Sequence, residues 1–500
     1  MEPTIGAGVT VLDYAVIGAF FALMVGIGVY FGRKTKSMAQ YFGGGKQIPW
    51  WLGGVSFYMV SFSAMAFVMH SELAYKYGAV SFVLSWMAVP AAVLSGVLFA
   101  RRWRRVASTS PLEYIEERYG AGMRQGLMWL GLPTRLLDNS IRLFAIGTVV
   151  STGLGFPFTW AICLCTVIIL GYSFMGGLLA SIVTDFVQFI LLLAGVVTLP
   201  ILALRRAGGV EATLQALPAD FWSWTRPDTK YTAIYLVCYF GVLFLNYSTS
   251  WALAQRYYST KDDKGAVKVG LLVAALYLIG TPLFYTPGLV AHNILPGLEN
   301  TKDVYPLLCR TLLPAGMLGM LVASLFSATM STLAGEYNAI SSVVTNDFYK
   351  RFIRKGASEK HLLLMGRLGA VAAGAIILGL TIVMRSLQEA NDLFDTMAKV
   401  FALFLPPVAI PMLLGMLTPR VSATGAKLGL AFGIASGIAT FVLGGYFTTF
   451  NLRETFVLLP LTICVTLLAI IIGSLAIPDR GERRARVLRF FENANGNRQD

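Results

Sequence analysis

The residues between Ser324 and Ser341 carry the clearest chemical signal in the chain, because small and hydroxyl-bearing side chains recur there at helical spacing. One predicted helix face would carry Ser324, Ser327, Ala328, Ser331, Ala334, Gly335, Asn338 and Ser341. Hydroxyl and carbonyl oxygens are hard ligands that suit a small cation stripped of most of its water. The same composition is also typical of closely packed transmembrane helices. The pattern alone leaves both interpretations open.

Asp185 is a second candidate, because a carboxylate inside an apolar segment is costly and often functional. No basic residue lies at helical spacing from it within its own segment. The residue type therefore predicts either a bound cation or a structural aspartate held by hydrogen bonds.

Other charges lie within predicted membrane segments. Arg135, Asp138 and Arg142 are spaced i, i+3 and i+7, which places them on one helix face. They form either a self-neutralising triad that fixes packing or part of a substrate site. Lys399 follows Asp395 at i+4 in a similar pair. Glu336 stays without a predicted role, and the three histidines are isolated: His70, His292 and His361.

Composition places these residues in a membrane protein. Hydrophobic residues make up 56% of the 500 and charged residues only 13%, against about 25% in soluble domains. The net charge of +14 does not indicate a nucleic-acid partner, because the basic residues cluster in short loops and in the tail. The five cysteines show neither metal-type nor redox-type spacing, so we expect them to be reduced.

About thirteen segments are long enough to cross a bilayer, which takes roughly 20 residues each. They cover roughly residues 11–32, 50–75, 79–100, 125–152, 156–175, 178–204, 231–254, 266–292, 312–345, 362–387, 391–416, 424–446 and 454–477. Basic clusters fall in alternate loops, on the side of the basic tail. We therefore expect the N-terminus outside, the C-terminus in the cytoplasm, one membrane domain over 1–479 and a tail over 480–500.

Two of these segments are poor continuous helices. Residues 50–75 begin with Trp50-Trp51-Leu-Gly53-Gly54 and continue through several serines, among them Ser63, and residues 231–254 contain Asn246-Tyr247-Ser248-Thr249-Ser250. They are five segments apart, and interrupted helices at matching positions indicate a binding site at the membrane midplane of an inverted-repeat transporter. The two repeats would cover about 50–204 and 231–416.

Several motifs resemble the sodium/solute symporter family, which includes sodium–glucose, proline and sialic acid cotransporters. They are Tyr41-Phe-Gly-Gly-Gly-Lys-Gln-Ile-Pro-Trp50-Trp51, Gly176-Gly177 through Thr184-Asp185, Gln255-Arg256, Ala328-Thr-Met-Ser331-Thr332 through Asn338, and Thr345-Asn-Asp347-Phe-Tyr349-Lys350-Arg351. The resemblance runs from the first segment to about residue 420. It implies an all-α LeuT-type fold, with inverted five-helix repeats and extra flanking helices.

The resemblance also implies a sodium site. Its ligands would be the carbonyls of Met59, Phe62 and Ala328 and the hydroxyls of Ser331 and Thr332. Asp185 matches a family carboxylate that assists sodium exit or holds a second sodium. Members with that second site have two further hydroxyls, where this chain has Ala334 and Gly335, so we expect one sodium per cycle.

The predicted substrate site combines residues from the interrupted segments, the charged positions and the family's ligand positions. It comprises Ser63, Ala66, Ser85, Asp138, Asn246, Tyr247, Ser250, Tyr277 and Lys399. Ala66, Ser85, Ala88 and Tyr277 replace polar or charged ligands of sugar carriers, which disfavours a glucose-type binding mode. Asp138 matches the carboxylate-binding arginine of sialic acid carriers, and Arg142 is one turn away.

We therefore predict a Na+-coupled symporter that imports a small polar solute, most simply a sugar or sugar derivative. A carboxylate or amino acid such as sialic acid or a proline-like substrate is the alternative, and proton-coupled and sensor variants stay open. An enzyme is disfavoured, because there is no zinc motif, nucleophile elbow or phosphate-binding loop. By resemblance, a monomer in the bilayer is sufficient.

Overall fold

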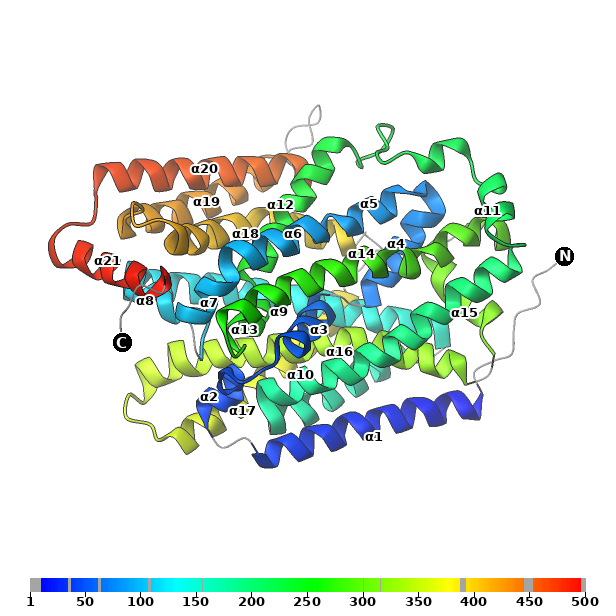
Figure 1. Ribbon diagram of the computed structural model, residues 1–500, viewed down its shortest axis with the longest axis horizontal. Coiled ribbons are helices and arrows are strands. Elements are labelled where there is room, and N and C mark those ends of the chain that lie inside the picture. Colours follow the sequence, from blue (N-terminus) through cyan, green and yellow to red (C-terminus); the bar gives the residue numbers. More distant parts are fainter. Residues whose placement is uncertain are drawn as a thin grey trace.

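A computed structural model describes residues 10–34, 37–61, 64–106, 109–154, 156–299, 301–314, 316–386, 393–444 and 453–495. Most helices run along the long axis of the molecule, with α1 and α20 at opposite edges of the view in Figure 1. Among the described residues, the β-structure consists of one isolated bridge, between Ile48 and Thr260. The expected all-α class is confirmed.

The first half of the chain contains the first interrupted segment and two long helices. Its elements are α1 (Val11–Lys34), α2 (Met38–Gly43), η1 (Gly44–Lys46), α3 (Trp50–Ser61), α4 (Ala64–Tyr77), α5 (Val80–Trp86), α6 (Ala88–Ser95), η2 (Gly96–Ala100), α7 (Arg101–Val106), α8 (Glu113–Tyr119), α9 (Ala121–Leu154), α10 (Phe158–Arg206), α11 (Val210–Ala216) and η3 (Ala219–Trp222).

The second half contains the second interrupted segment and ends in a short surface helix. Its elements are α12 (Ala233–Thr249), α13 (Trp251–Tyr258), α14 (Asp263–Ile294), η4 (Thr301–Asp303), α15 (Val304–Leu312), α16 (Met317–Val343), η5 (Val344–Ile353), α17 (Glu359–Ser386), α18 (Leu393–Leu417), α19 (Ala423–Leu443), α20 (Thr455–Ala476) and α21 (Gly481–Asn495).

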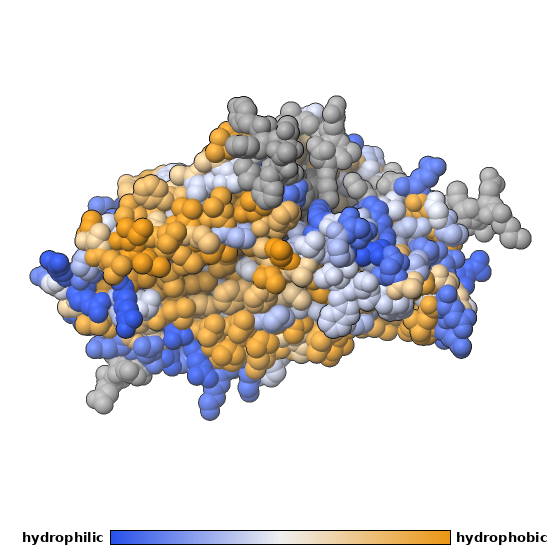
Figure 2. Space-filling model, turned by 90° about the horizontal axis from the view of Figure 1, so that it is seen from above, coloured by the Kyte–Doolittle hydropathy of each residue, from blue (hydrophilic) through white to orange (hydrophobic). Residues whose placement is uncertain are grey.

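The outer surface is that of a membrane protein. Figure 2 shows an extensive hydrophobic surface, with hydrophilic residues gathered toward the ends of the long axis. Within the described residues, nine helices are long and apolar enough to cross a bilayer, or ten if α12 and α13 form one span. Helices also cover the three remaining predicted segments (α3 with α4, α9 and the first part of α10), but the number thirteen stays a prediction.

Two breaks shape the interior. α12 and α13 are bent by 54° at Ser250, whose backbone is not helical (φ −56°, ψ 130°). Within α10, Gly177 adopts φ 59° and ψ −149°, a conformation that only glycine adopts readily, and this separates the helix into two predicted spans. The other predicted interruption lies between α3 and α4, where residues 62–63 are outside the described residues.

α16, which carries the hydroxyl-rich face, is the innermost helix among these spans. In its most apolar 18-residue stretch 89% is buried inside the protein, compared with 28% in the corresponding stretch of α1. It packs against α10, α17, α9 and α3, so its small residues face protein on all sides. The small residues of α16 are therefore closely packed, and their role as cation ligands stays a prediction.

Candidate sodium and substrate site

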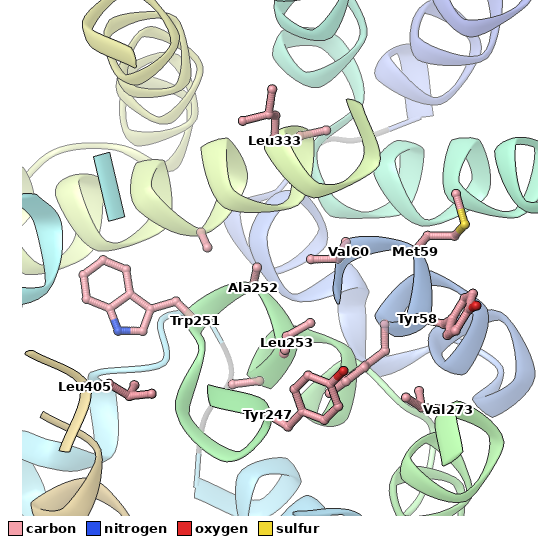
Figure 3. Packing of buried hydrophobic residues seen from close by; sticks show 14 of the residues in the cluster. Tyr58, Met59, Val60, Tyr247, Trp251, Ala252, Leu253, Val273, Leu333 and Leu405 are labelled. Carbon is pink, nitrogen blue, oxygen red and sulfur yellow. The ribbon is translucent and has the colours of Figure 1, made fainter. Parts of the chain in front are cut away.

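Oxygen atoms of α3 and α16 converge beside the first interruption. The Thr332 hydroxyl donates to the Ala328 carbonyl at 3.1 Å and lies 3.5 Å from the Met59 carbonyl. The Ser331 hydroxyl is fully buried without a hydrogen-bond partner. Figure 3 shows the elements that meet here, with Met59 and Val60 from α3 and Leu333 from α16. A buried, unpartnered hydroxyl beside further oxygens fits a small cation.

Asp185 of α10 lies next to this group of oxygens, with its carboxylate near the Ser331 hydroxyl. It accepts a hydrogen bond from Ser56 and lies 3.4 Å from the Arg256 Nη2, and both charged side chains are fully buried. Asp185 therefore has a basic neighbour from another helix, although its own segment offers none. Spacing within one helix could not reveal a partner that comes from α13.

A cavity opens beside the oxygen group. Val60, Ser61 and Thr332 form its wall on that side. We call it the charged cavity because four ionisable residues line it: Arg135, Asp138, Arg142 and Glu336. Its remaining walls include the non-helical Ser250 and aromatic residues of α13 and α18.

The four charges form two separate pairs, so the α9 residues do not form the self-neutralising triad that was one of their two interpretations. Arg142 Nε lies 3.1 Å from Asp138 Oδ2 within α9. Arg135 instead pairs with Glu336 of α16 and covers the Trp251 ring at 4.7 Å. Helical spacing predicted that the three residues share one face of α9. It could not predict that Glu336, which had no predicted role, would pair with Arg135 from another helix.

A second cavity continues from the first, and the two share the lining residues Ser61, Arg142, Asn246 and Phe401. We call it the tyrosine cavity after Tyr239, Tyr247, Tyr277 and Tyr285. Hydroxyls are linked across it: Tyr277 Oη lies 3.0 Å from Ser61 Oγ. Such walls combine apolar ring faces with hydrogen-bonding groups, as in sites for small polar molecules.

Most predicted substrate residues lie on these two cavities. Ala66, Ser85, Tyr247 and Tyr277 line the tyrosine cavity, as does Ala88; Asp138 and Ser250 line the charged cavity; Asn246 lines both. Lys399 is not among the lining residues of either cavity, although its neighbours Ala398 and Val400 are. Ser63 and the predicted sodium ligand Phe62 are outside the described residues, and so is the Asp395 side chain.

Two residues had roles that the sequence did not reveal. His70, one of the three histidines that are isolated in the sequence, lines the tyrosine cavity and stacks on Tyr285 with ring centroids 4.3 Å apart. Arg256 was part of a family motif without an assigned role, and it reaches Asp185 from a different helix. A buried charge within the short helix that follows the break was the available signal for Arg256.

Comparison with known proteins agrees with this architecture. Residues 41–433 match the sequence model of the sodium:solute symporter family, which is more than half of the chain. The chain belongs to the sodium:solute symporter family. Members of this family are transporters, so the expectation that the chain is not an enzyme is confirmed.

Individual relatives transport different solutes. The sodium/sialic acid symporter SiaT of Proteus mirabilis is 26% identical over 440 residues, which is 84% of this chain and 87% of that protein. The sodium/mannose cotransporter SLC5A10 of Bos taurus is 29% identical over 488 residues, covering 85% and 78% respectively. The relatives couple transport to sodium, and the expected use of Na+ by this symporter is confirmed.

Among solved structures, a Na+-coupled sialic acid symporter in a substrate-bound outward-open state has a TM-score of 0.83. It is 22% identical and covers 94% of this chain and 98% of that chain. At this identity the likeness shows the fold, which is the expected LeuT type. The chain is thus a multi-pass membrane transporter that uses sodium and a small solute.

Proposed function

We propose that this symporter imports a small neutral solute rich in hydroxyl groups, a sugar or sugar derivative, together with one sodium per cycle. The supporting observation is the charge balance of the two cavities. Arg135 is paired with Glu336 and Arg142 with Asp138, so the described ionisable lining residues sum to zero. A carboxylate substrate would bring an unpaired charge into this neutral site, which is costly where the charge is buried.

The hydrogen-bonding groups at the junction of the cavities match a polyhydroxyl solute. Asp138 Oδ1 is buried without a hydrogen-bond partner, so it can accept from a solute hydroxyl. Arg142 and Asn246 line both cavities and offer donors to solute oxygens. The mannose cotransporter among the relatives favours this substrate class. The sialic acid relatives favour the alternative, an anionic or zwitterionic solute bound by Arg142.

Sodium would bind to the carbonyls of Met59 and Ala328 and the hydroxyls of Ser331 and Thr332. These oxygens come from α3 and α16, and a cation between them would hold the end of α3 against α16. Ser61, two residues after Met59, lines both cavities. A sodium-dependent shift of the end of α3 would therefore change the walls that contact the solute. Coupling of this kind requires that sodium bind the solute-competent conformation more tightly than the other.

The direction of transport follows from the proposed orientation. α7, which carries four arginines, and α21 lie together at one end of the molecule, and α11 lies at the other (Figure 1). Basic ends face the cytoplasm. The N-terminus would then be outside and the tail cytoplasmic, in the cell inner membrane, with a monomer in the bilayer as the working unit. Membrane potential would add ~2.3 kcal/mol per sodium per 100 mV.

Uptake into proteoliposomes tests this function. An inward sodium gradient should drive accumulation of a labelled neutral sugar from a panel that also contains sialic acid, proline and small carboxylates. A potassium gradient of equal size is the control, and a protonophore separates proton coupling. Accumulation of sialic acid or proline alone would contradict the neutral-solute proposal, and accumulation abolished by the protonophore and equal in both salts would contradict sodium coupling.

A further inference from the structure

The break between α12 and α13 leaves backbone carbonyls at the end of α12 without helical donors, because the last four carbonyls of a helix have none. The Asn246 carbonyl accepts a hydrogen bond from the Ser250 amide at 2.8 Å. The next two carbonyls belong to Tyr247 and Ser248, which are both buried. Figure 3 shows Tyr247 and Trp251 on either side of this break. A buried carbonyl without a donor is costly, so both carbonyls need partners from elsewhere in the chain.

Two side chains of the segment formed by α6, η2 and α7 supply these donors. Ser95 Oγ, at the end of α6, donates to the Tyr247 carbonyl at 3.0 Å. Trp103 Nε1, in α7, donates to the Ser248 carbonyl at 2.8 Å. Both donor side chains are completely buried. One neighbouring segment therefore satisfies both carbonyls at the break.

A π-helical turn brings the two donors to the same side of this segment. Ser95 and Trp103 are eight residues apart, which in a continuous α-helix would leave their side chains about 80° apart around the axis. The π-helix η2 (Gly96–Ala100) lies between them, and its wider turn reduces that angle. η2 is fixed against α14, because a Cβ on Gly96 would lie 3.0 Å from the Gly270 Cα atom. Backbone packing therefore sets the position of both donors.

The Trp103 ring is held in place by aromatic neighbours. It meets the Tyr114 ring of α8 edge-on, with centroids 5.3 Å apart, and Tyr114 stacks on Phe490 of α21 at 6.1 Å. The Tyr114 hydroxyl donates to the Met412 carbonyl of α18 at 2.9 Å. The indole N–H therefore reaches the break from a ring that is packed and anchored on its other side.

The carbonyls held in this way belong to the residues that line the two cavities. Asn246 lines both cavities, Tyr247 lines the tyrosine cavity and Ser250 lines the charged cavity. Within the described part of the chain, the walls of the two cavities do not include Ser95 or Trp103. A change at either donor would therefore reach the cavities only through the backbone of the break.

We propose that Ser95 and Trp103 are positioning residues of the solute site. They hold the carbonyls of Tyr247 and Ser248, and thereby fix the side chains around the break without touching the solute. This inference rests on the solute site proposed above. Because sodium would bind between α3 and α16, the loss of either donor should weaken solute binding and leave sodium binding unchanged.

Hydrogen exchange measured by mass spectrometry tests the positioning without a known solute. In sodium buffer, peptides covering residues 245–258 should exchange roughly fivefold faster in Trp103→Phe and Ser95→Ala than in wild type, because each variant leaves a buried carbonyl unpaired and favours local opening. Trp86→Phe is the matched control, since Trp86 Nε1 donates to the Leu278 carbonyl inside the continuous helix α14, at 3.2 Å. It should exchange as wild type does over 245–258, and α16 should exchange as in wild type in every variant.

Uptake into proteoliposomes tests the consequence for the solute. The probes are labelled mannose and the other neutral sugars of the uptake panel. For a sugar that wild type accumulates, the KM should rise about fivefold or more in Trp103→Phe and in Ser95→Ala. The half-saturating sodium concentration, measured by direct sodium binding without sugar, should stay as in wild type. If Trp103→Phe does not fold, Ser95→Ala decides the result.

The outcomes separate this proposal from the proposed function. Exchange over residues 245–258 that is no faster in the two variants than in Trp86→Phe would overturn the positioning role. An unchanged KM despite faster exchange, or a loss of sodium binding together with the change in KM, would overturn it as well. A wild-type protein that accumulates no neutral sugar would overturn the proposed function, and hydrogen exchange would still decide whether Ser95 and Trp103 hold the break.

Discussion

Arg135 Nη1 donates to both carboxylate oxygens of Glu336 at 3.0 Å, which joins α9 to α16 beside the broken helix. Ser250, at the break between α12 and α13, also donates to Glu336 Oε1, at 3.3 Å. Three elements, α9, α16 and the break between α12 and α13, therefore meet on one carboxylate.

We expect Glu336→Gln or Arg135→Gln alone to destabilise this conformation by about 3–5 kcal/mol, because each leaves a buried charge without its partner. The variant with both substitutions should recover much of that loss. Melting temperatures of the four proteins in detergent measure the coupling. If the losses of the two single variants simply add in the double variant, the two residues do not form a pair. Ser250→Ala, which removes only a neutral hydroxyl from Glu336, should cost only about 1 kcal/mol.

The sodium ligands can be tested on the same helix. Thr332→Ala and Ser331→Ala each remove one oxygen ligand from the charged sodium ion. A contact to a charged group is worth about 1.5–3 kcal/mol, so the half-saturating sodium concentration should rise about tenfold or more. Ser327→Ala is the control, since that hydroxyl donates only within α16, to the Ala323 carbonyl at 2.7 Å. An unchanged sodium requirement in both ligand variants would remove them from the site.

Arg142 should act on the solute and not on sodium. Arg142→Gln removes donors from the junction of the cavities and leaves Asp138 unpaired, so the KM for the solute should rise about tenfold or more at saturating sodium. The half-saturating sodium concentration measured by direct sodium binding should stay unchanged. Arg385→Gln, which alters an exposed cation over the Phe158 ring, should affect neither quantity. Solute KM values equal to wild type would exclude Arg142 from the site.

Gly177 should tolerate no side chain. A Cβ there would lie 2.6 Å from the Tyr41 carbonyl oxygen, and the backbone conformation itself costs other residues about 1–3 kcal/mol. We expect Gly177→Ala to lower the yield of folded protein and its melting temperature. Gly171→Ala on the same helix is the control, and an equal effect of both variants would show that helix substitution alone is responsible.

Acid should weaken one contact outside the membrane spans. Glu116 of α8 accepts from Arg351 at 2.5 Å and from Arg124 at 2.8 Å, and these bonds lower its pKa below the ordinary 4.5. A carboxyl with a lowered folded-state pKa stabilises the protein above pH 4.5, and this stabilisation is lost as the pH falls through the lowered value. Glu116→Gln should therefore melt below wild type at pH 7, and the difference should shrink toward pH 4. A constant difference would contradict the ion pair.

The sequence predicted what depends on local pattern. The helical class, the apolar segments and the break near Ser250 follow from composition and from spacing along one helix. The pairing of Ser331 with Thr332 as sodium ligands is what the family resemblance implies. The sequence could not predict which charges meet across helices. Asp185 pairs with Arg256, which is 71 residues further along the chain. Arg135 pairs with Glu336, 201 residues away, and not with its neighbours on α9. His70 was missed for the same reason, since its place depends on how α4 packs against α14.

Ligand-induced thermal stabilisation of the purified protein tests sodium-coupled binding of a neutral solute most directly. A ligand that binds the folded state raises the melting temperature by mass action. Neutral sugars, amino sugars, sialic acids, amino acids and small carboxylates would each be added in sodium and, separately, in potassium. We predict stabilisation by a neutral hydroxyl-rich compound in sodium only. Equal stabilisation in both salts would contradict the coupling, and a response confined to carboxylates would contradict the substrate class.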